Sequence, residues 1–171
     1  MDARDFAIQA HGDQKYGDEP YVTHLDQVWA VLQEYGFTET CVRNGAFLHD
    51  VLEDCPNVSR EDIKAKFGNA TVYIVDFCTD EPGHNRKERK AATYKRVRAT
   101  IDLYPIQDNF FGIYAIRVKV ADRLSNLRSC HAVNPGLLPM YRKEREAFKT
   151  ALYAPGVCDA MWAEYDALLG A

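Results

Sequence analysis

Residues 46–54 read AFLHDVLED, and this stretch decides both the expected fold and the position of its unusual polar residues. Its apolar residues fit a helix over residues 39–54, but four ionisable residues interrupt them: His49, Asp50, Glu53 and Asp54. A helix turns about 100° per residue, so these four side chains share an arc of about 140°. Carboxylates this close repel one another, and they oppose the helix dipole near a C-terminus. A bound cation would remove that cost, whereas the alternative is an exposed acidic face.

Most of the remaining chain also reads as amphipathic helices separated by turn residues. Thr23 is the expected N-cap of one helix, with Asp26 as a capping-box variant and Gly36 at its end. Residues 70–79 are apolar and partly β-branched, yet we expect a buried helix there rather than a strand. Apolar residues also recur at helical spacing through a basic segment: Tyr94, Val97, Ile101 and Tyr104.

The other expected helices complete an all-α pattern. Ser59 is a second N-cap, with Asp62 three residues on. The remaining helices are expected at residues 2–11, 59–68, 110–131, 137–153 and 156–169. We therefore predict an all-α fold, a compact single-domain helical bundle over residues 1–171.

Composition narrows the class of protein further. The chain has 47% hydrophobic and 27% charged residues, as in a globular domain, and no apolar run of membrane-spanning length. The charged N-terminus does not resemble a signal peptide, so a cytoplasmic location is expected. The five cysteines are scattered and are expected to be reduced. A net charge of −4 argues against nucleic-acid binding, and nothing indicates an oligomeric state.

The charge is unevenly distributed along the chain. Residues 86–98 contain seven Lys or Arg and one acid, Glu88, a local net charge of 7 − 1 = +6. Such a cluster in an acidic protein indicates either a small anionic ligand or a solvated helix face.

A carboxylate also interrupts the apolar stripe of the helix expected at 110–131. Phe111, Ala115 and Val118 define the stripe, and its next positions are polar: Asp122, Asn126 and Ser129. A buried carboxylate needs a partner, which is either a metal ion or a cation from another helix. Together with His24, His49 and Asp50, Asp122 makes a set of two imidazoles and two carboxylates. Such ligands suit Mn²⁺, Fe²⁺ or Mg²⁺, and open coordination positions suit hydrolysis of phosphates.

The order of these residues resembles the HD superfamily of phosphohydrolases, and the flanking sequence resembles the hydrolase domain of RelA/SpoT homologues. The resemblance runs from about residue 5 to about residue 153. Its residues are Gln14, EPYVTH at 19–24, AFLHDVLED at 46–54, FG at 67–68 and VKVADRLSNLR at 118–128. HD alone is a weak signal, but the HD-x-x-ED and K-x-ADR-x-x-N blocks in this order are specific.

The resemblance implies an α-helical fold, a Mn²⁺ site and a nucleotide substrate. The implied reaction removes the 3′-diphosphate of guanosine tetra- or pentaphosphate, leaving GDP or GTP and diphosphate. The chain would be a stand-alone small alarmone hydrolase without a synthetase domain. The implied metal ligands are His24, His49, Asp50 and Asp122, and the implied catalytic pair is Glu53 and Asp54. The implied substrate-binding residues are Arg86, Lys87, Lys90, Asn126, Ser129 and Tyr141.

The sequence departs from the family pattern in two places, and the first concerns recognition of the base rather than the metal. The segment KYGDEPY at residues 15–21 is one residue shorter than usual and lacks the arginine that packs on guanine, so Lys15 or Tyr16 is expected to replace it. Leu25 replaces a usual proline. Three readings stay open: an alarmone hydrolase, an HD phosphohydrolase acting on another nucleotide such as NADPH, and a non-catalytic HD binding domain. The last would be expected to lack a ligand or the Glu-Asp pair, and neither is missing.

Overall fold

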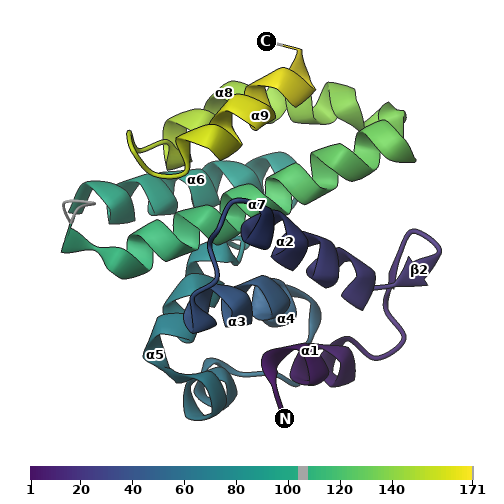
Figure 1. Cartoon of the computed structure of the whole chain (residues 1–171), viewed down its shortest axis with the longest axis vertical. Coiled ribbons are helices and arrows are strands. Elements are labelled where there is room, and N and C mark those ends of the chain that lie inside the picture. The colour runs from purple at the N-terminus through teal and green to yellow at the C-terminus, as the bar shows by residue number, and fades with distance from the viewer. Residues whose placement is uncertain (104–107, 171) are drawn as a thin grey trace.

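A long central helix, α7, separates two groups of helices (Figure 1). The computed structural model describes residues 1–103 and 108–170. On one side of α7 lie α1 to α5, and on the other lie α6, α8 and α9. The elements are α1 (Ala3–His11), β1 (Lys15–Tyr16), β2 (Glu19–Pro20), α2 (Val22–Glu34), α3 (Thr40–Leu48), α4 (Val51–Asp54), α5 (Arg60–Cys78), α6 (Arg86–Leu103), α7 (Phe110–Ala132), the 3-10 turn η2 (Pro135–Leu137), α8 (Leu138–Leu152) and α9 (Asp159–Leu169).

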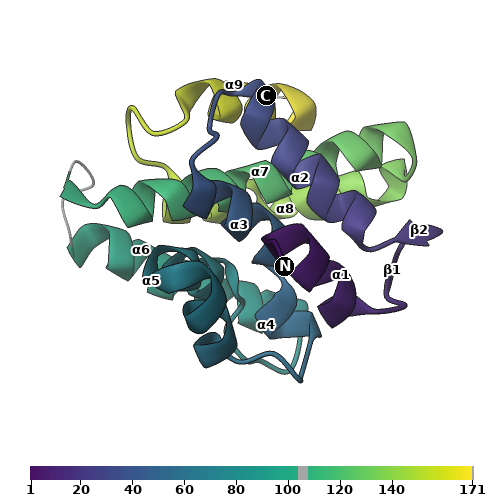
Figure 2. The same cartoon turned by 60° about the horizontal axis from the view of Figure 1, so that its bottom comes forward.

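The all-α prediction is confirmed, including the helix expected at residues 70–79, which forms the second half of α5. The described strands have two residues each and form a hairpin in the expected loop, with Lys15 paired to Pro20 and Tyr16 to Glu19. Figure 2 shows α1 beside α3, with this hairpin between the end of α1 and the start of α2. Within the described residues, no helix is both long and apolar enough to cross a bilayer.

The core explains why α7 is central. Its side chains Ala115, Ile116 and Val118 are fully buried, and α7 contacts α2, α3, α5, α8 and α9. A second apolar cluster under α1 includes Phe47 and Leu48 of α3. Burial of side chains of this size contributes about 1.5–3 kcal/mol each, so these two clusters hold α2, α3 and α7 in fixed relative positions.

The helix expected over residues 39–54 is wrong in one respect, because it breaks at His49 and Asp50. α3 ends at Leu48, and α4 begins at Val51 with Asp50 as its N-cap. The His49 ring lies 2.9 Å from the Ala46 carbonyl oxygen, the acceptor that the amide of residue 50 would use in a continuous helix. A side chain that competes for a helix carbonyl favours a break. The arc calculated for an unbroken helix therefore does not apply.

Of the two expected N-caps, Ser59 is confirmed and Thr23 is corrected. Ser59 and Asp62 form the expected capping box, and α5 kinks at Gly68. Thr23 is not an N-cap, because α2 begins at Val22; Asp26 instead accepts two hydrogen bonds from Arg4.

The apolar stripe expected on α7 needs one correction, whereas the stripe expected on α6 is confirmed at its described positions. The stripe expected on α7 holds at Ala115 and Val118 but not at Phe111, whose ring lies at the exposed start of the helix. In the basic segment, Tyr94, Val97 and Ile101 are buried on α6, and Tyr104 lies outside the described residues.

Candidate active site

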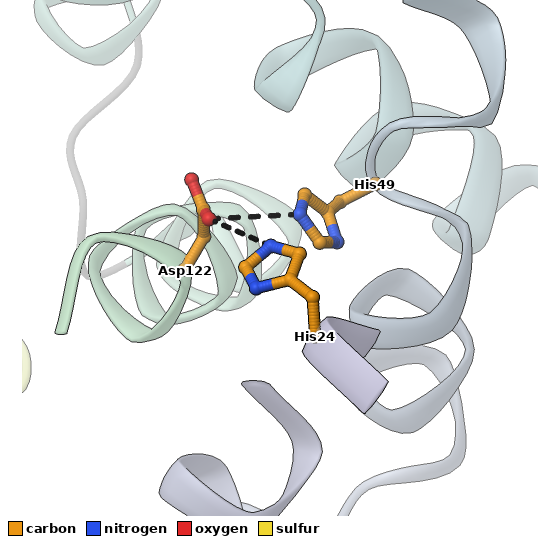
Figure 3. A group of neighbouring side chains, drawn as sticks. All are labelled: His24, His49 and Asp122. Atoms are coloured by element: carbon orange, nitrogen blue, oxygen red, sulfur yellow. Dashed lines mark ion pairs between the residues drawn. The ribbon is translucent and has the colours of Figure 1, made fainter. Parts of the chain in front are cut away.

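Three side chains from distant parts of the chain converge where α2, α7 and the break between α3 and α4 meet. Figure 3 shows His24, His49 and Asp122 pointing toward one another. Asp122 Oδ1 lies 3.2 Å from His24 Nε2 and 3.7 Å from His49 Nε2. One ligand atom from each residue lies within 4.8 Å of the others, a spacing suited to one metal ion.

Asp50 lies in the same cluster. Its Oδ2 atom is 3.0 Å from His49 Nε2 and 3.9 Å from His24 Nε2. The break between α3 and α4 allows this arrangement, because it turns the adjacent His49 and Asp50 toward a common point. All four residues expected as ligands therefore lie together, and their role as ligands stays a prediction.

The surroundings of His49 fit a metal ligand. The ring is about 1% exposed, and its Nδ1 atom lies against the Ala46 carbonyl oxygen, which can only accept a hydrogen bond. Nδ1 must therefore bear a hydrogen, so in the neutral ring the lone pair is on Nε2. Within the described residues, Nε2 is buried without a hydrogen-bond partner. Buried polar atoms are rarely left unpaired, so an imidazole fixed in this way is suited to a cation.

The charges of the cluster also indicate a cation. Burial would lower the pKa of His49, but the carboxylates of Asp50 and Asp122 outweigh it and hold this pKa well above its ordinary value. Burial would raise the pKa of Asp122, but the neighbouring imidazoles of His24 and His49 hold it well below its ordinary range. The cluster thus favours ionised carboxylates with positive charge beside them. Imidazole nitrogens and carboxylate oxygens together suit Mn²⁺, Fe²⁺ or Mg²⁺.

The expected catalytic pair lies on α4, directly after the break. Glu53 Oε1 accepts a hydrogen bond from the Asp80 amide at 2.6 Å, and Asp54 Oδ2 accepts one from Gln14 Nε2 at 2.8 Å. Burial and the Asp80 carboxylate raise the pKa of Glu53. The two neighbouring carboxyl groups therefore have different environments: burial and Asp80 favour the protonated form of Glu53, and the Gln14 amide orients the carboxylate of Asp54.

Four of the expected substrate-binding residues line one cavity of about 470 Å³ beside the cluster: Tyr16, Asn126, Ser129 and Tyr141. The Tyr16 ring stacks on His24 at a centroid distance of 4.7 Å, and its hydroxyl donates to Asn126 Oδ1 at 3.0 Å. Asn126 Nδ2 in turn donates to Asp122 Oδ1 at 2.6 Å. This cavity is therefore joined to the cluster through side chains. Lys15 is exposed and does not line it.

The three expected cations of the basic segment lie elsewhere. Arg86, Lys87 and Lys90 line a separate cavity of about 710 Å³ between α6 and α8. Arg86 pairs with Glu144 at 2.7 Å, and Lys90 pairs with Asp80 at 2.7 Å. Lys90 therefore lies near Glu53, because the Asp80 amide also bonds Glu53.

Sequence reasoning assigned no role to several side chains that contact the site residues. Tyr21 donates to Asp50 Oδ2 at 2.5 Å, and Gln14 donates to Asp54. The buried Lys119 lies 3.8 Å from Asp80. Gln14, Tyr21 and Lys119 all lie in the sequence blocks that support the family resemblance, which was the signal available for finding them.

Fold and site together define an HD-type helical domain, and comparison with known proteins agrees. The model of a family described as HD domain matches residues 3–155, so the chain belongs to the HD domain family. The expected resemblance to HD hydrolases is therefore confirmed.

Two of the similar proteins are named for a particular reaction. The chain is 34% identical over 151 residues to a Vibrio cholerae protein named guanosine-3′,5′-bis(diphosphate) 3′-pyrophosphohydrolase, covering 87% of this chain and 20% of the relative. The chain thus spans about a fifth of that relative's length. It is 33% identical to the Xenopus tropicalis protein of the same name, MESH1, covering 79% of this chain and 71% of the relative.

A solved structure supports the fold. It is described as a metazoan ortholog of SpoT that hydrolyzes ppGpp, and it matches with a TM-score of 0.75 over 97% of this chain and 90% of that chain. The identity is 24%, so this match supports the fold alone.

Proposed function

We propose that this chain is a metal-dependent hydrolase that removes the 3′-diphosphate from guanosine tetra- or pentaphosphate, yielding GDP or GTP and diphosphate. The main supporting observation is the convergence of His24, His49 and Asp122, with Asp50 beside them and an unpaired nitrogen aimed into the cluster. The relatives named for this reaction support the choice of substrate.

The residues proposed to hold the metal are His24, His49, Asp50 and Asp122. We propose Mn²⁺, because two imidazoles and two carboxylates suit it. When bound, the ion would polarise a phosphoryl oxygen and make water more acidic. Tyr21 and Asn126 assist by bonding the carboxylates of Asp50 and Asp122, which fixes the orientation of both groups.

Glu53 and Asp54 divide the proton transfers. Water attacks the phosphorus atom bonded to the ribose 3′ oxygen, and the bond between that oxygen and phosphorus breaks. Asp54 accepts the proton of the water, because the hydrogen bond from the Gln14 amide holds its carboxylate in a fixed orientation. Glu53 donates a proton to the leaving ribose oxygen, since burial and Asp80 favour its protonated form. The products are a free 3′-hydroxyl and diphosphate, and the proton taken by Asp54 balances the one given by Glu53.

The cavity beside the cluster is the proposed place for the nucleoside. Tyr16 offers an aromatic face, while Asn126, Ser129 and Tyr141 offer polar groups for the base and ribose. Arg86, Lys87 and Lys90 are proposed to attract the phosphates, with Lys15 at the edge of the hairpin. The free cysteines and a small nucleotide as the only proposed partner fit a cytoplasmic location, which is part of this proposal.

The test is a nucleotide panel with the Mn²⁺-loaded protein. Wild-type protein should release diphosphate from ppGpp and pppGpp, and Asp122→Ala should abolish both the release and Mn²⁺ binding measured by calorimetry. Asp102→Ala is the matched control, because this exposed carboxylate lies on α6 and bonds Arg98. Intact ppGpp after prolonged incubation with the loaded wild-type protein would reject the proposal. Release of phosphate from NADPH, without release of diphosphate from ppGpp or pppGpp, would instead support an HD phosphohydrolase that acts on another nucleotide.

A further inference from the structure

We propose that His11 is a positioning residue that controls two active-site carboxylates through two different parts of its ring. The ring edge orients Asp54 through Gln14, and the ring face orients Asp50 through Tyr21. The turnover part of this inference rests on the proposed function, whereas the metal-binding part does not require turnover.

His11 ends α1 and is about 8% exposed. Its ring stacks on Tyr21 with a centroid distance of 4.4 Å and an angle of 29° between the planes. Its Nδ1 atom lies 2.8 Å from Gln14 Oε1. One buried imidazole thus contacts two side chains that each bond a different carboxylate of the site.

The Gln14 arm has a defined polarity. Gln14 Nε2 donates to Asp54 Oδ2, so its amide oxygen is the atom that faces His11. An amide oxygen only accepts, and therefore His11 Nδ1 must bear the hydrogen. The resulting chain of donors runs from His11 through Gln14 to Asp54. It occupies Oδ2 of Asp54 and leaves Oδ1 available to accept a proton.

The Tyr21 arm uses the face of the same ring. The Tyr21 hydroxyl donates to Asp50 Oδ2 at 2.5 Å, and stacking on His11 limits the directions that the tyrosine ring can take. The backbone connects the two arms, because the Tyr21 amide donates to the Gln14 carbonyl at 3.0 Å. The Gln14 amide donates to the His11 carbonyl at 3.1 Å. The segment between α1 and α2 (Figure 2) therefore holds the three side chains as one unit.

A purely packing role does not explain these contacts. A phenylalanine would fill the space between α1 and Tyr21 without the cost of burying a polar ring. The imidazole adds a polar edge that phenylalanine lacks: its Nδ1 hydrogen is directed at Gln14, and Cys55 Sγ lies 3.5 Å from the same nitrogen. Asparagine offers the opposite combination, an N–H donor without an aromatic face. The two substitutions therefore separate the two arms.

The experiment compares His11→Phe, His11→Asn and Tyr21→Phe with wild-type protein. Mn²⁺ affinity is measured by calorimetry, and kcat and KM for ppGpp are measured at saturating Mn²⁺. Loss of a partner outside the ligand set typically costs about 10–100-fold in affinity or activity. His11→Phe should therefore lower kcat by about 10–100-fold while keeping KM and Mn²⁺ affinity. His11→Asn should recover most of kcat but should bind Mn²⁺ more weakly than wild-type protein. Tyr21→Phe should also bind Mn²⁺ more weakly.

The matched control is His131→Phe. His131 is an exposed histidine of α7 that bonds the Leu168 carbonyl, so its replacement should change neither quantity. The inference is overturned if both His11 variants lose kcat and Mn²⁺ affinity in the same ratio, as general destabilisation would cause. It is also overturned if kcat and Mn²⁺ affinity stay unchanged in both variants. If wild-type protein does not hydrolyse ppGpp, the proposed function fails by itself. Mn²⁺ affinity then decides, and equal affinities for His11→Phe and His11→Asn would overturn the inference.

Discussion

Glu53 and Asp54 are neighbours in sequence with different hydrogen-bond partners. Glu53 lies at the exposed end of α4 near Lys119, and it accepts its one described hydrogen bond from the Asp80 amide. Burial and the Asp80 carboxylate raise its pKa, which favours a carboxyl group that still has its proton. A raised pKa favours the acid role for Glu53, and Asp54, which the Gln14 amide orients, is left for the base role.

Replacing Glu53 with glutamine tests this assignment. Glu53→Gln preserves shape and the contact with the Asp80 amide, but an amide cannot transfer the proton. We expect kcat for ppGpp to fall by about 10²–10⁴-fold with little change in Mn²⁺ affinity, measured by steady-state kinetics and calorimetry. Glu61→Gln, at an exposed position early in α5, is the control. Loss of Mn²⁺ binding would instead make Glu53 a ligand, and unchanged kcat would remove it from the mechanism.

The residues of the site could be predicted from the sequence to different extents. Asp122 was predictable because a carboxylate on an apolar stripe needs a partner. His24 depended on the family resemblance, since a single histidine near a helix start has no distinctive pattern. The contacts of His11 could not be predicted, because they depend on the path of the segment between α1 and α2. Hydrogen bonds across such a segment leave no periodic signal in the sequence.

Among the elements, α3 approaches α5 and α7 most closely at Gly45. A Cβ atom there would lie 2.5 Å from Ile74 Cγ2 and 3.4 Å from Val118 Cγ2. Gly45 lies one turn before His49 on the same helix, so the close approach sets how far the break between α3 and α4 stands from α7. Packing at this residue thus determines the separation of His49 from Asp122.

Gly45→Ala should therefore destabilise the protein despite the better helix propensity of alanine. Overpacking in a core typically costs about 1–3 kcal/mol, against a propensity gain of about 1 kcal/mol. We expect a net loss of up to about 2 kcal/mol in the free energy of unfolding, measured by urea denaturation. Gly136→Ala is the control, because the nearest atom to its new Cβ would be 3.5 Å away. Equal stabilities of the two variants would show that α3 shifts without cost.

Helix boundaries were predicted well where local chemistry sets them. The capping box at Ser59 depends on residues three apart, so the sequence shows it directly. The break at His49 was not predicted, because the periodic pattern runs through it without interruption. The competing hydrogen bond to the Ala46 carbonyl, together with the contact of Tyr21 with Asp50, involves orientations that a sequence pattern does not contain.

Across the whole molecule, Glu144 joins three helices. It accepts hydrogen bonds from Arg86 of α6 at 2.7 Å and from Arg123 of α7 at 3.0 Å, while lying itself on α8. The charge cluster of residues 86–98 was interpreted from sequence as an anion site or a solvated face. Arg86 instead has a partner 58 residues away, a pairing that no local pattern could show.

This ion-pair group predicts a stability that depends on pH. Burial would raise the pKa of Glu144, but Arg86 and Arg123 outweigh it and place the pKa below its ordinary value of 4.5. A lowered pKa means that the contribution to stability is present above 4.5 and is lost as the pH falls through the folded-state pKa. Glu144→Gln should lower the free energy of unfolding by about 1–3 kcal/mol at pH 7, measured by urea denaturation.

The difference between the two proteins should shrink as the pH is lowered below about 4.5, because wild-type Glu144 then also becomes neutral. Glu146→Gln, at a highly exposed position 4.0 Å from Arg145, should show neither effect. A difference that is constant from pH 7 to pH 3 would contradict the ionic origin of the stabilisation.

The convergence of α2, the α3–α4 break and α7 has a consequence for the life of the protein in the cell. His24 and Asp122 are 122 − 24 = 98 residues apart, so the ligand cluster exists only once the distant helices have docked. A metal ion bound there is bound by the folded chain and not by the unfolded one. Free metal at 100 times its dissociation constant then adds about 2.7 kcal/mol to the stability of the whole fold. Metal scarcity would therefore increase the unfolded fraction that proteases remove, so that metal supply would regulate the amount of this protein as well as its activity.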